Sequence, residues 1–247
     1  MKHIKSYQIF ESREVIMGGI LNAMRHRNID LFVELIEQHS QFVDFQMIVD
    51  AIIPGRTTSD EFTFTVQINI YLPYLNYIPF EYLADVKRIS IPNYGLSKLE
   101  GIESLLNLET LSLANNSLTD LSLLRGLTKI KTLELKRNKL TNLNGIETLV
   151  NLNTLYCAEN QLTELNLEYF PNLEHLDCSQ NQISEITGLE ILTKLRTMEC
   201  HSNNLTSIEG IVDLPKFRSI SCMSNKLPSE VNRALNDLDK IRAYYRQ

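Results

Sequence analysis

Apolar positions in the central and C-terminal parts of the chain recur at a fixed interval. The first clear copy follows the frame Leu-x-x-Leu-x-Leu-x-x-Asn-x-Leu and consists of Leu108, Leu111, Leu113, Asn116 and Leu118. Later copies of the frame start at Ile130, Leu152, Leu173, Leu195 and Phe217. The interval is 22 residues, apart from one step of 21 between the third and fourth copies. Self-similarity with such a period is typical of solenoids, in which one supersecondary unit stacks on the next.

Within each copy, the central residues alternate between apolar and polar, which is the pattern of a strand with one buried face. A single unit cannot bury that face, so we expect the units to stack at a spacing of about 4.8 Å as a parallel sheet over a continuous core. The asparagine that follows each strand can both donate and accept, so it can satisfy backbone groups in the turn. A degenerate earlier copy has Tyr94 at this position, which predicts a capping coil.

The frame resembles the leucine-rich-repeat family, in particular its short-repeat bacterial branch, which includes the internalins and the phosphatase-regulating proteins. The resemblance covers residues 86–227 and extends to the second half of each unit, where Leu121, Leu124 and Leu127 recur as Leu143, Ile146 and Leu149. It implies an α/β fold, a right-handed leucine-rich-repeat solenoid with a parallel β-sheet on its concave face. It also implies that a protein partner binds on that face.

The pattern changes at both ends of the repeats, which predicts three parts: residues 1–80, 81–227 and 228–247. The last part has a helical stripe of apolar residues and predicts a capping helix; the stripe consists of Val231, Ala234, Leu235, Leu238, Ile241 and Tyr245. The first part predicts a mainly helical cap, with helices over residues 12–26, 28–39 and 41–53. Alternation over residues 62–70 predicts a strand, which we expect to extend the sheet of the solenoid.

Charge and hydropathy narrow the choice of partner. The formal net charge is −6 and there is no long run of Lys and Arg, so we expect no nucleic-acid partner. No segment approaches the roughly 18 apolar residues of a membrane span, and residues 1–10 lack the pattern of a signal peptide. We therefore expect a cytoplasmic monomer that does not bind membranes, while secretion by a route without a signal peptide stays open.

The four cysteines occupy one core-facing position of successive copies: Cys157, Cys178, Cys200 and Cys222. Strands in register point their Cβ atoms the same way, and a straight ladder cannot converge four thiolates on one zinc ion. We therefore predict buried free thiols that act as small apolar side chains, which fits a reducing compartment. No metal or other cofactor is expected.

The outward strand positions offer the candidate binding residues. The middle copies carry the charges and the aromatic side chain of this face: Glu134, Lys136, Tyr156, His175, Asp177, Glu199 and His201. A tyrosine surrounded by acidic groups is typical of an interface anchor with a polar rim, and the acidic stripe favours a basic partner surface. The alternative is a sheet face that is merely solvated.

Catalysis is the less favoured interpretation of the same face. His175, Asp177, Glu199 and His201 include ligand and acid–base side chains, but side chains on strands stand parallel on an open surface. We therefore predict a non-enzymatic protein-interaction module with no catalytic residues. The main alternative is a regulator or secreted effector whose activity lies in residues 1–80, with the repeats as a targeting device. A sugar-binding face is less favoured, because one aromatic side chain offers little stacking.

Overall fold

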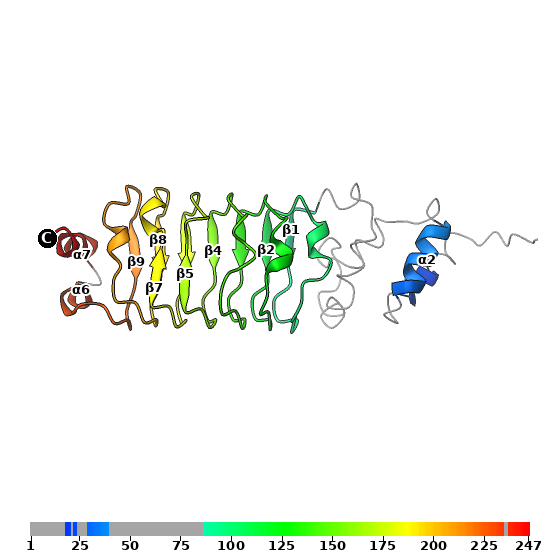
Figure 1. Cartoon of the computed structure of the whole chain (residues 1–247), viewed down its shortest axis with the longest axis horizontal. Coiled ribbons are helices and arrows are strands. Elements are labelled where there is room, and N and C mark those ends of the chain that lie inside the picture. Colours follow the sequence, from blue (N-terminus) through cyan, green and yellow to red (C-terminus); the bar gives the residue numbers. More distant parts are fainter. Residues whose placement is uncertain (1–17, 21, 24–28, 40–85, 235–236) are drawn as a thin grey trace, which may run out of the picture. The chain divides into compact units, whose positions relative to one another are not determined.

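The computed structural model describes residues 18–20, 22–23, 29–39, 86–234 and 237–247. The chain divides into two compact units, Met1–Tyr82 and Leu83–Gln247. In the first unit, residues 18–20 and 22–23 are helical, and helix α2 spans Ile29–His39 with Phe32 fully buried (Figure 1). The predicted helix over residues 41–53 and the predicted strand over residues 62–70 lie outside the described residues. Within the described part, no helix has the length and apolarity needed to cross a membrane.

The repeats form a parallel sheet of seven short strands. In spatial order these are β1 (Arg88–Ser90), β2 (Thr110–Ser112), β3 (Thr132–Glu134), β4 (Thr154–Tyr156), β6 (His175–Asp177), β8 (Thr197–Glu199) and β9 (Ser219–Ser221). Equivalent repeat positions lie side by side: Leu111 pairs with Ile89 on one side and Leu133 on the other. Figure 1 shows the coils stacked in chain order. The predicted solenoid with a parallel sheet is therefore confirmed.

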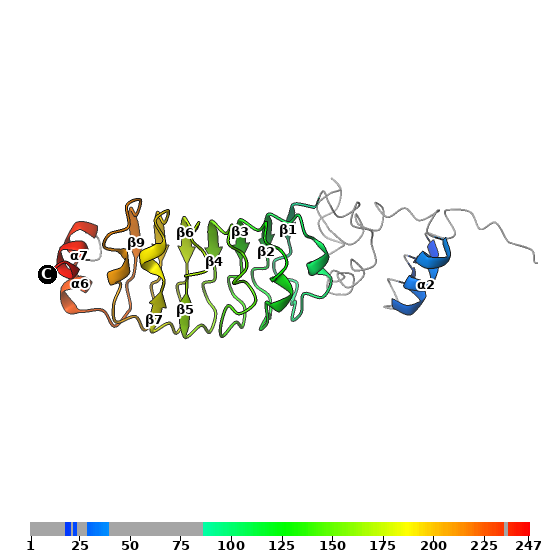
Figure 2. The same cartoon turned by 45° about the horizontal axis from the view of Figure 1, so that its top comes forward.

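The rest of each coil returns to the sheet through short elements. Four coils use 3₁₀ turns, at η3 (Ile102–Ser104), η4 (Ser122–Leu124), η5 (Leu189–Ile191) and η6 (Glu209–Ile211). Two further strands, β5 (Glu164–Asn166) and β7 (Glu185–Thr187), pair in parallel as a separate sheet on another side of the coils (Figure 2). This second sheet was not predicted from the sequence, because its strands lie outside the repeat frame that predicted the first sheet.

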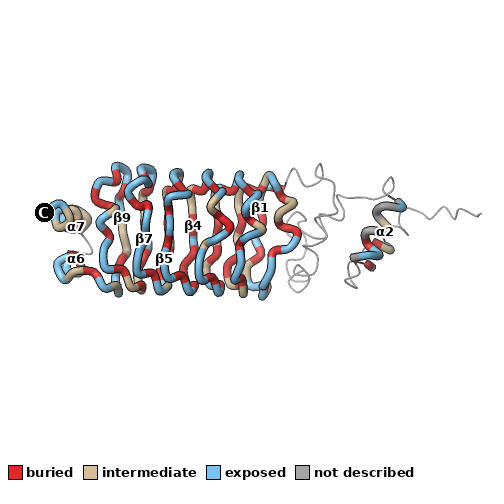
Figure 3. The backbone as a smooth tube through the Cα atoms, in the orientation of Figure 1, coloured by how far each residue is buried: buried red, intermediate tan, exposed pale blue. Residues whose placement is uncertain are grey.

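The apolar frame positions form one continuous core. Leu111, Leu133 and Leu155 have no exposed surface, and buried residues recur along every turn of the tube in Figure 3. Full burial of such a side chain contributes roughly 1.5–3 kcal/mol before the loss of conformational entropy is subtracted. The interior that the repeat pattern predicted is therefore the observed one.

The turn after each strand has the same geometry in successive coils, and the asparagine side chains stabilise it. Asn138 Nδ2 donates to the carbonyl oxygens of Leu113 and Leu135, at 2.9 Å in each case. Asn138 Oδ1 accepts from the backbone N–H of Leu118 at 3.0 Å. Because each amide joins two coils, the asparagines form a ladder of hydrogen bonds, as predicted. In the first coil, the backbone N–H of Tyr94 donates to the Asn116 side chain. Tyr94 therefore contributes a backbone donor to the first amide of the ladder, but no side-chain amide of its own.

The residue just before each ladder position has a positive φ. Arg137, Glu159 and Gln180 have φ values of 56°, 54° and 53°. The left-handed conformation is unfavourable for most side chains and is tolerated best by Gly and Asn. Most of these turns therefore hold a residue whose own preference opposes its backbone, and the stacking must stabilise them.

Gly145 is required by close packing between coils. Its φ is 106°, and a Cβ at this position would lie 2.6 Å from the carbonyl carbon and oxygen of Leu121 in the preceding coil. Gly126 differs, since a Cβ there would meet nothing within 4 Å. Only the first of these two glycines is needed for a close backbone approach.

The C-terminal segment forms two helices where the apolar stripe predicted one. These are α6 (Ser229–Arg233) and α7 (Leu238–Tyr245), and Asp237 caps α7 by accepting from the backbone N–H of Lys240 at 3.1 Å. An Asp at this place starts a new helix, because its carboxylate satisfies a backbone N–H that has no partner in the first turn. The Tyr245 hydroxyl accepts from Ile208 N at 3.2 Å and thereby ties α7 to the last coil.

Candidate functional site

The outward side chains at the middle of the strands form a line across the sheet, which we call the central row. It consists of Ser90, Ser112, Glu134, Tyr156, Asp177, Glu199 and Ser221. The register places Tyr156 directly between Glu134 and Asp177, and Glu199 next to Asp177. The structure therefore brings together four of the residues that the sequence analysis selected.

Neighbouring hydroxyl groups hold two of these carboxylates. Glu134 accepts from the Ser112 hydroxyl at 2.5 Å. Asp177 accepts from the backbone N–H of Ser179 at 3.0 Å and from its hydroxyl at 2.6 Å. Tyr156, by contrast, is 39% exposed. The centre of the row is thus an exposed ring between two oriented carboxylates.

The flanking residues of the predicted site are partly engaged within the protein. His175 Nδ1 lies 2.8 Å from Thr197 Oγ1, and His201 Nδ1 lies 3.3 Å from Ser202 Oγ. Lys136 forms an ion pair with Glu159 at 3.2 Å. Because its charge is compensated in this way, Lys136 does little to neutralise the central row.

Glu159 also receives the Arg137 guanidinium, whose Nε lies 2.6 Å from Glu159 Oε2. That hydrogen bond is the main cause that lowers the pKa of Glu159, and burial acts against it. Glu159 is therefore ionised and bridges the two cations at the ends of the strands.

The geometry of this face does not gather groups for metal binding. Among the described residues, no group of three or more His, Cys, Asp and Glu side chains is arranged to hold a metal ion. The carboxylates of the sheet face can attract a cationic partner group, but they stand in parallel on an open surface.

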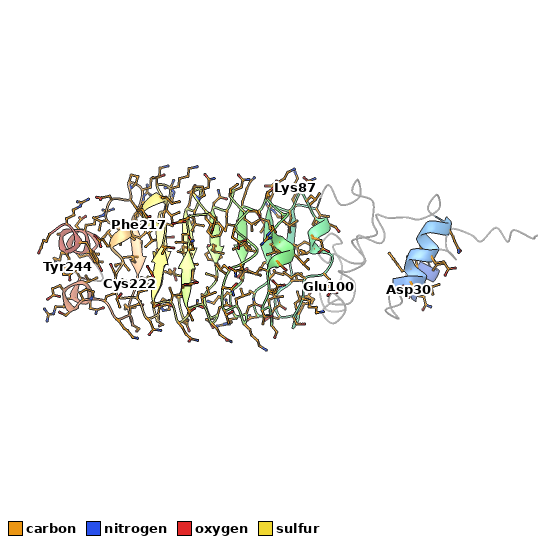
Figure 4. All side chains as sticks on the ribbon, in the orientation of Figure 1. Asp30, Lys87, Glu100, Phe217, Cys222 and Tyr244 are labelled. Atoms are coloured by element: carbon orange, nitrogen blue, oxygen red, sulfur yellow. The ribbon has the colours of Figure 1, made fainter. Side chains whose placement is uncertain are left out.

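An open pocket lies between α6 and α7, away from the sheet face. It is lined in part by Arg233, Lys240 and Tyr244, and Tyr244 is labelled at the C-terminal end in Figure 4.

All four cysteines are free and buried, as the sequence predicted. Burial raises the pKa of the Cys157 and Cys178 thiols well above the usual range. For Cys200, a hydrogen bond with the Cys222 thiol and burial both raise the pKa. Cys222 is labelled inside the last coil in Figure 4. The same hydrogen bond with Cys200 lowers the pKa of Cys222. The Cys157, Cys178 and Cys200 thiols are therefore protonated members of the core.

The sequence analysis missed a group of cations beside the start of the strands. Lys194 and Arg196 precede β8, and Lys216 and Arg218 precede β9 at the equivalent positions. The available signal was a Lys-x-Arg pair repeated after 22 residues, which a search for continuous basic runs does not detect.

Comparisons with known proteins agree with this architecture. A family model described as leucine-rich repeats (two copies) matches residues 106–148 and again residues 150–191. A comparison with curated protein sequences gives no match. The chain is similar in structure to internalin C2 of Listeria monocytogenes, with 28% identity, a TM-score of 0.51, and coverage of 64% of this chain and 80% of the other.

Two further solved structures are similar over the same region. The functional domain of InlJ from Listeria monocytogenes, described as including a cysteine ladder, has 26% identity and a TM-score of 0.52, with coverage of 65% of this chain and 42% of that one. A leucine-rich-repeat protein of Leptospira interrogans has 26% identity and a TM-score of 0.52, with coverage of 63% and 48%. This chain thus spans less than half of either protein. On its repeat frame, its stacked register and these similarities, the chain contains a leucine-rich-repeat solenoid that is similar to those of the internalins.

Proposed function

We propose that this protein is a non-enzymatic recognition module that binds another protein on the outward face of its seven-stranded sheet. The observation that carries the proposal is the exposed Tyr156 ring between the carboxylates of Glu134 and Asp177. Tyrosines of this kind are favoured at the centre of interfaces, because they bury a large area at a small cost in conformational entropy. Similarity to leucine-rich-repeat proteins supports a role in protein interaction.

Contacts within the protein hold both the backbone and two of the carboxylates of the proposed site. Its backbone is fixed by strand pairing on both sides, and two of its carboxylates are oriented by serine hydroxyls. A preorganised surface loses little conformational freedom on association, which leaves more of the contact energy for affinity. Tyr156, Glu134, Asp177 and Glu199 form the centre of the proposed site, with Lys136, His175 and His201 around it.

The charge of the site defines the chemistry of the partner. Glu134, Asp177 and Glu199 have no cation on neighbouring strands of the central row. A basic partner surface would complement them, and long-range attraction between exposed charges is screened by salt. We therefore expect association to slow and weaken as the ionic strength rises.

A site-specific photo-crosslinking experiment tests the proposal with a matched control. A benzophenone amino acid replaces Tyr156 in one variant and Tyr169 in the other. Both tyrosines are similarly exposed, at 39% and 44%, but Tyr169 lies outside the seven-stranded sheet, in the segment after β5. We expect a discrete covalent adduct from position 156 and none from position 169.

Charge-neutral variants sharpen this test. Replacement of Glu134 by Gln and Asp177 by Asn should reduce the adduct at position 156 without changing the thermal stability much, since both groups are partly exposed. An equal yield of the same adduct from position 169 would refute the sheet face as the binding site. The absence of any adduct at position 156, with the same protein captured at position 169, would refute it equally.

A further inference from the structure

Residues just before the strands form a second charged line, which we call the strand-start edge. In each coil it is formed by two positions separated by a buried residue. Two coils have the sequence Asn-x-Glu there, at Asn107 and Glu109 and at Asn172 and Glu174. In both cases the following coil presents two cations, at Lys129 and Lys131 and at Lys194 and Arg196.

Each of these cation pairs is held by the preceding Asn-x-Glu pair in the same way. Lys129 Nζ donates to Asn107 Oδ1 at 2.5 Å, and Lys131 Nζ lies 2.7 Å from Glu109 Oε2. The same pair of contacts recurs at Lys194, which is 65 residues after Lys129. A Lys-x-Lys or Lys-x-Arg pair at this edge is therefore matched by one amide oxygen and one carboxylate.

The second copy of this arrangement has closely similar distances. Lys194 Nζ donates to Asn172 Oδ1 at 2.6 Å, and Arg196 Nε lies 2.8 Å from Glu174 Oε2. The hydrogen bond from Arg196 is also the main cause that lowers the pKa of Glu174. Arg196 is thus the main partner of the carboxylate of this copy, and Lys216 attracts it more weakly.

A third cation pair, Lys216 and Arg218, has no such match. Its preceding coil presents Lys194 and Arg196, and the backbone N–H of Arg218 donates to the Arg196 carbonyl at 2.9 Å, so like charges occupy stacked positions. Both Lys216 and Arg218 are exposed, and neither forms an ion pair with any described residue. Like charges that face each other on adjacent strands are destabilising, and only a weaker, longer-range attraction of Lys216 to Glu174 opposes this repulsion.

The C-terminal helix adds another cation beside the pair. Arg242 Nη2 donates to the carbonyl oxygens of Leu214 and Phe217, at 3.4 Å each, on either side of Lys216 along the chain. A protein with a net charge of −6 thus gathers Lys194, Arg196, Lys216, Arg218 and Arg242 at one end of one edge. Figure 4 places Phe217, the residue between Lys216 and Arg218, in this last coil.

We propose that Lys216 and Arg218 bind an acidic peptide segment of the partner protein, which supplies the amide oxygen and the carboxylate that Asn-x-Glu supplies in the two internal copies. The proposal rests on the proposed function, because it gives the same partner a second contact. The central row takes basic groups and the strand-start edge takes acidic groups, so the two together fix the direction in which the partner lies across the sheet.

The surroundings favour a peptide over a nucleic acid. The whole protein carries a formal net charge of −6, which disfavours association with an extended phosphate backbone. The cation group also spans only the last two coils, whereas a nucleic-acid site normally follows a longer basic surface.

A titration with a synthetic peptide tests this proposal directly. The probe is a fluorescein-labelled peptide that repeats Asn-Thr-Glu, and its control repeats Asn-Thr-Gln. We expect salt-sensitive binding of the acidic peptide alone, weakened about tenfold by the double substitution K216Q/R218Q, since two exposed charge contacts are lost. The matched substitution K129Q/K131Q, at cations already paired within the protein, should leave the peptide affinity unchanged.

The thermal stability of the free protein gives a second readout. Removing the stacked like charges with K216Q/R218Q should raise the melting temperature at low salt, and this gain should vanish at high salt. Equal peptide binding by the two double variants, or tighter binding of a short oligonucleotide than of the peptide, would overturn the proposal. If the peptide experiment overturned this proposal but the adduct at position 156 still formed, the proposed function would stand.

Discussion

Replacement of one ladder asparagine should destabilise the protein by an amount that its hydrogen bonds define. Asn160 is 9% exposed. Its Nδ2 donates to the carbonyl oxygens of Leu135, Cys157 and Ala158 at 3.0, 3.0 and 3.1 Å. Its Oδ1 accepts from the backbone N–H of Leu140 at 3.0 Å. The substitution Asn160→Ala removes all of these contacts at once.

The consequences differ between the donor and acceptor sides. Each of the three carbonyl oxygens keeps a second donor, from the Asn138 side chain, the Asn181 side chain and the Arg137 backbone N–H respectively. The loss of each hydrogen bond from Asn160 Nδ2 to these oxygens should therefore cost only about 0.5 kcal/mol. The buried N–H of Leu140 keeps no partner among the described residues, which costs about 1–3 kcal/mol. The expected total is about 3 kcal/mol.

Equilibrium unfolding in urea, followed by circular dichroism, measures this loss. Asn160→Asp should be worse than Ala at neutral pH, because a carboxylate would face three carbonyl oxygens. Asn142→Ala, at an exposed turn residue, is the control and should change stability by less than about 0.5 kcal/mol. If Asn160→Ala behaved like this control, the ladder would not stabilise the coils and our account of the turn would be wrong.

Further substitutions test other parts of the fold. Gly145→Ala should lower stability by about 2–4 kcal/mol through a backbone clash and the positive φ, whereas Gly126→Ala should be neutral or slightly stabilising in the same urea titration. Glu159→Gln should lower the melting temperature at neutral pH and match the wild type in acid: the Arg137 hydrogen bond lowers the folded-state pKa of Glu159, so its contribution is lost as the pH falls through that pKa. Gln180→Asn should raise the melting temperature and Gln180→Val should lower it, because φ at this position is positive; equal effects would argue against the left-handed turn.

The repeat frame predicted the register because every second side chain of a strand faces the same side, and because the frame marks the equivalent position in each coil, including the one that is a residue shorter. Once Leu111 and Leu133 occupy the core, Ser112 and Glu134 must face outward on adjacent strands, and the structure pairs them. The same reasoning placed Tyr156 between its acidic neighbours. The asparagine ladder followed from the capacity of one amide to donate and accept.

Other features depend on contacts that the frame does not encode. The left-handed backbone at Arg137 is imposed by the turn, and no local preference of Arg predicts it. The apolar stripe of the C-terminal segment is continuous and does not show where one helix ends and the next begins. The start of α7 is marked by a single capping residue, Asp237. The cations at Lys216 and Arg218 were missed because the basic residues were sought as one continuous run, whereas these become neighbours of Lys194 and Arg196 through the stacking of the coils.

The central claim is that successive residues of each strand face opposite sides of the sheet. A comparison of cysteine labelling rates tests this claim most directly. Cys200 is fully buried, and its neighbour in sequence, Glu199, is exposed. In the native wild type, burial and the raised thiol pKa values of Cys157, Cys178 and Cys200 should make the labelling of these three thiols much slower than in urea. The variant Glu199→Cys should gain one rapidly labelled thiol. Native cysteines that react as fast as unfolded ones, or a protected cysteine at position 199, would contradict the arrangement on which the proposed binding face depends.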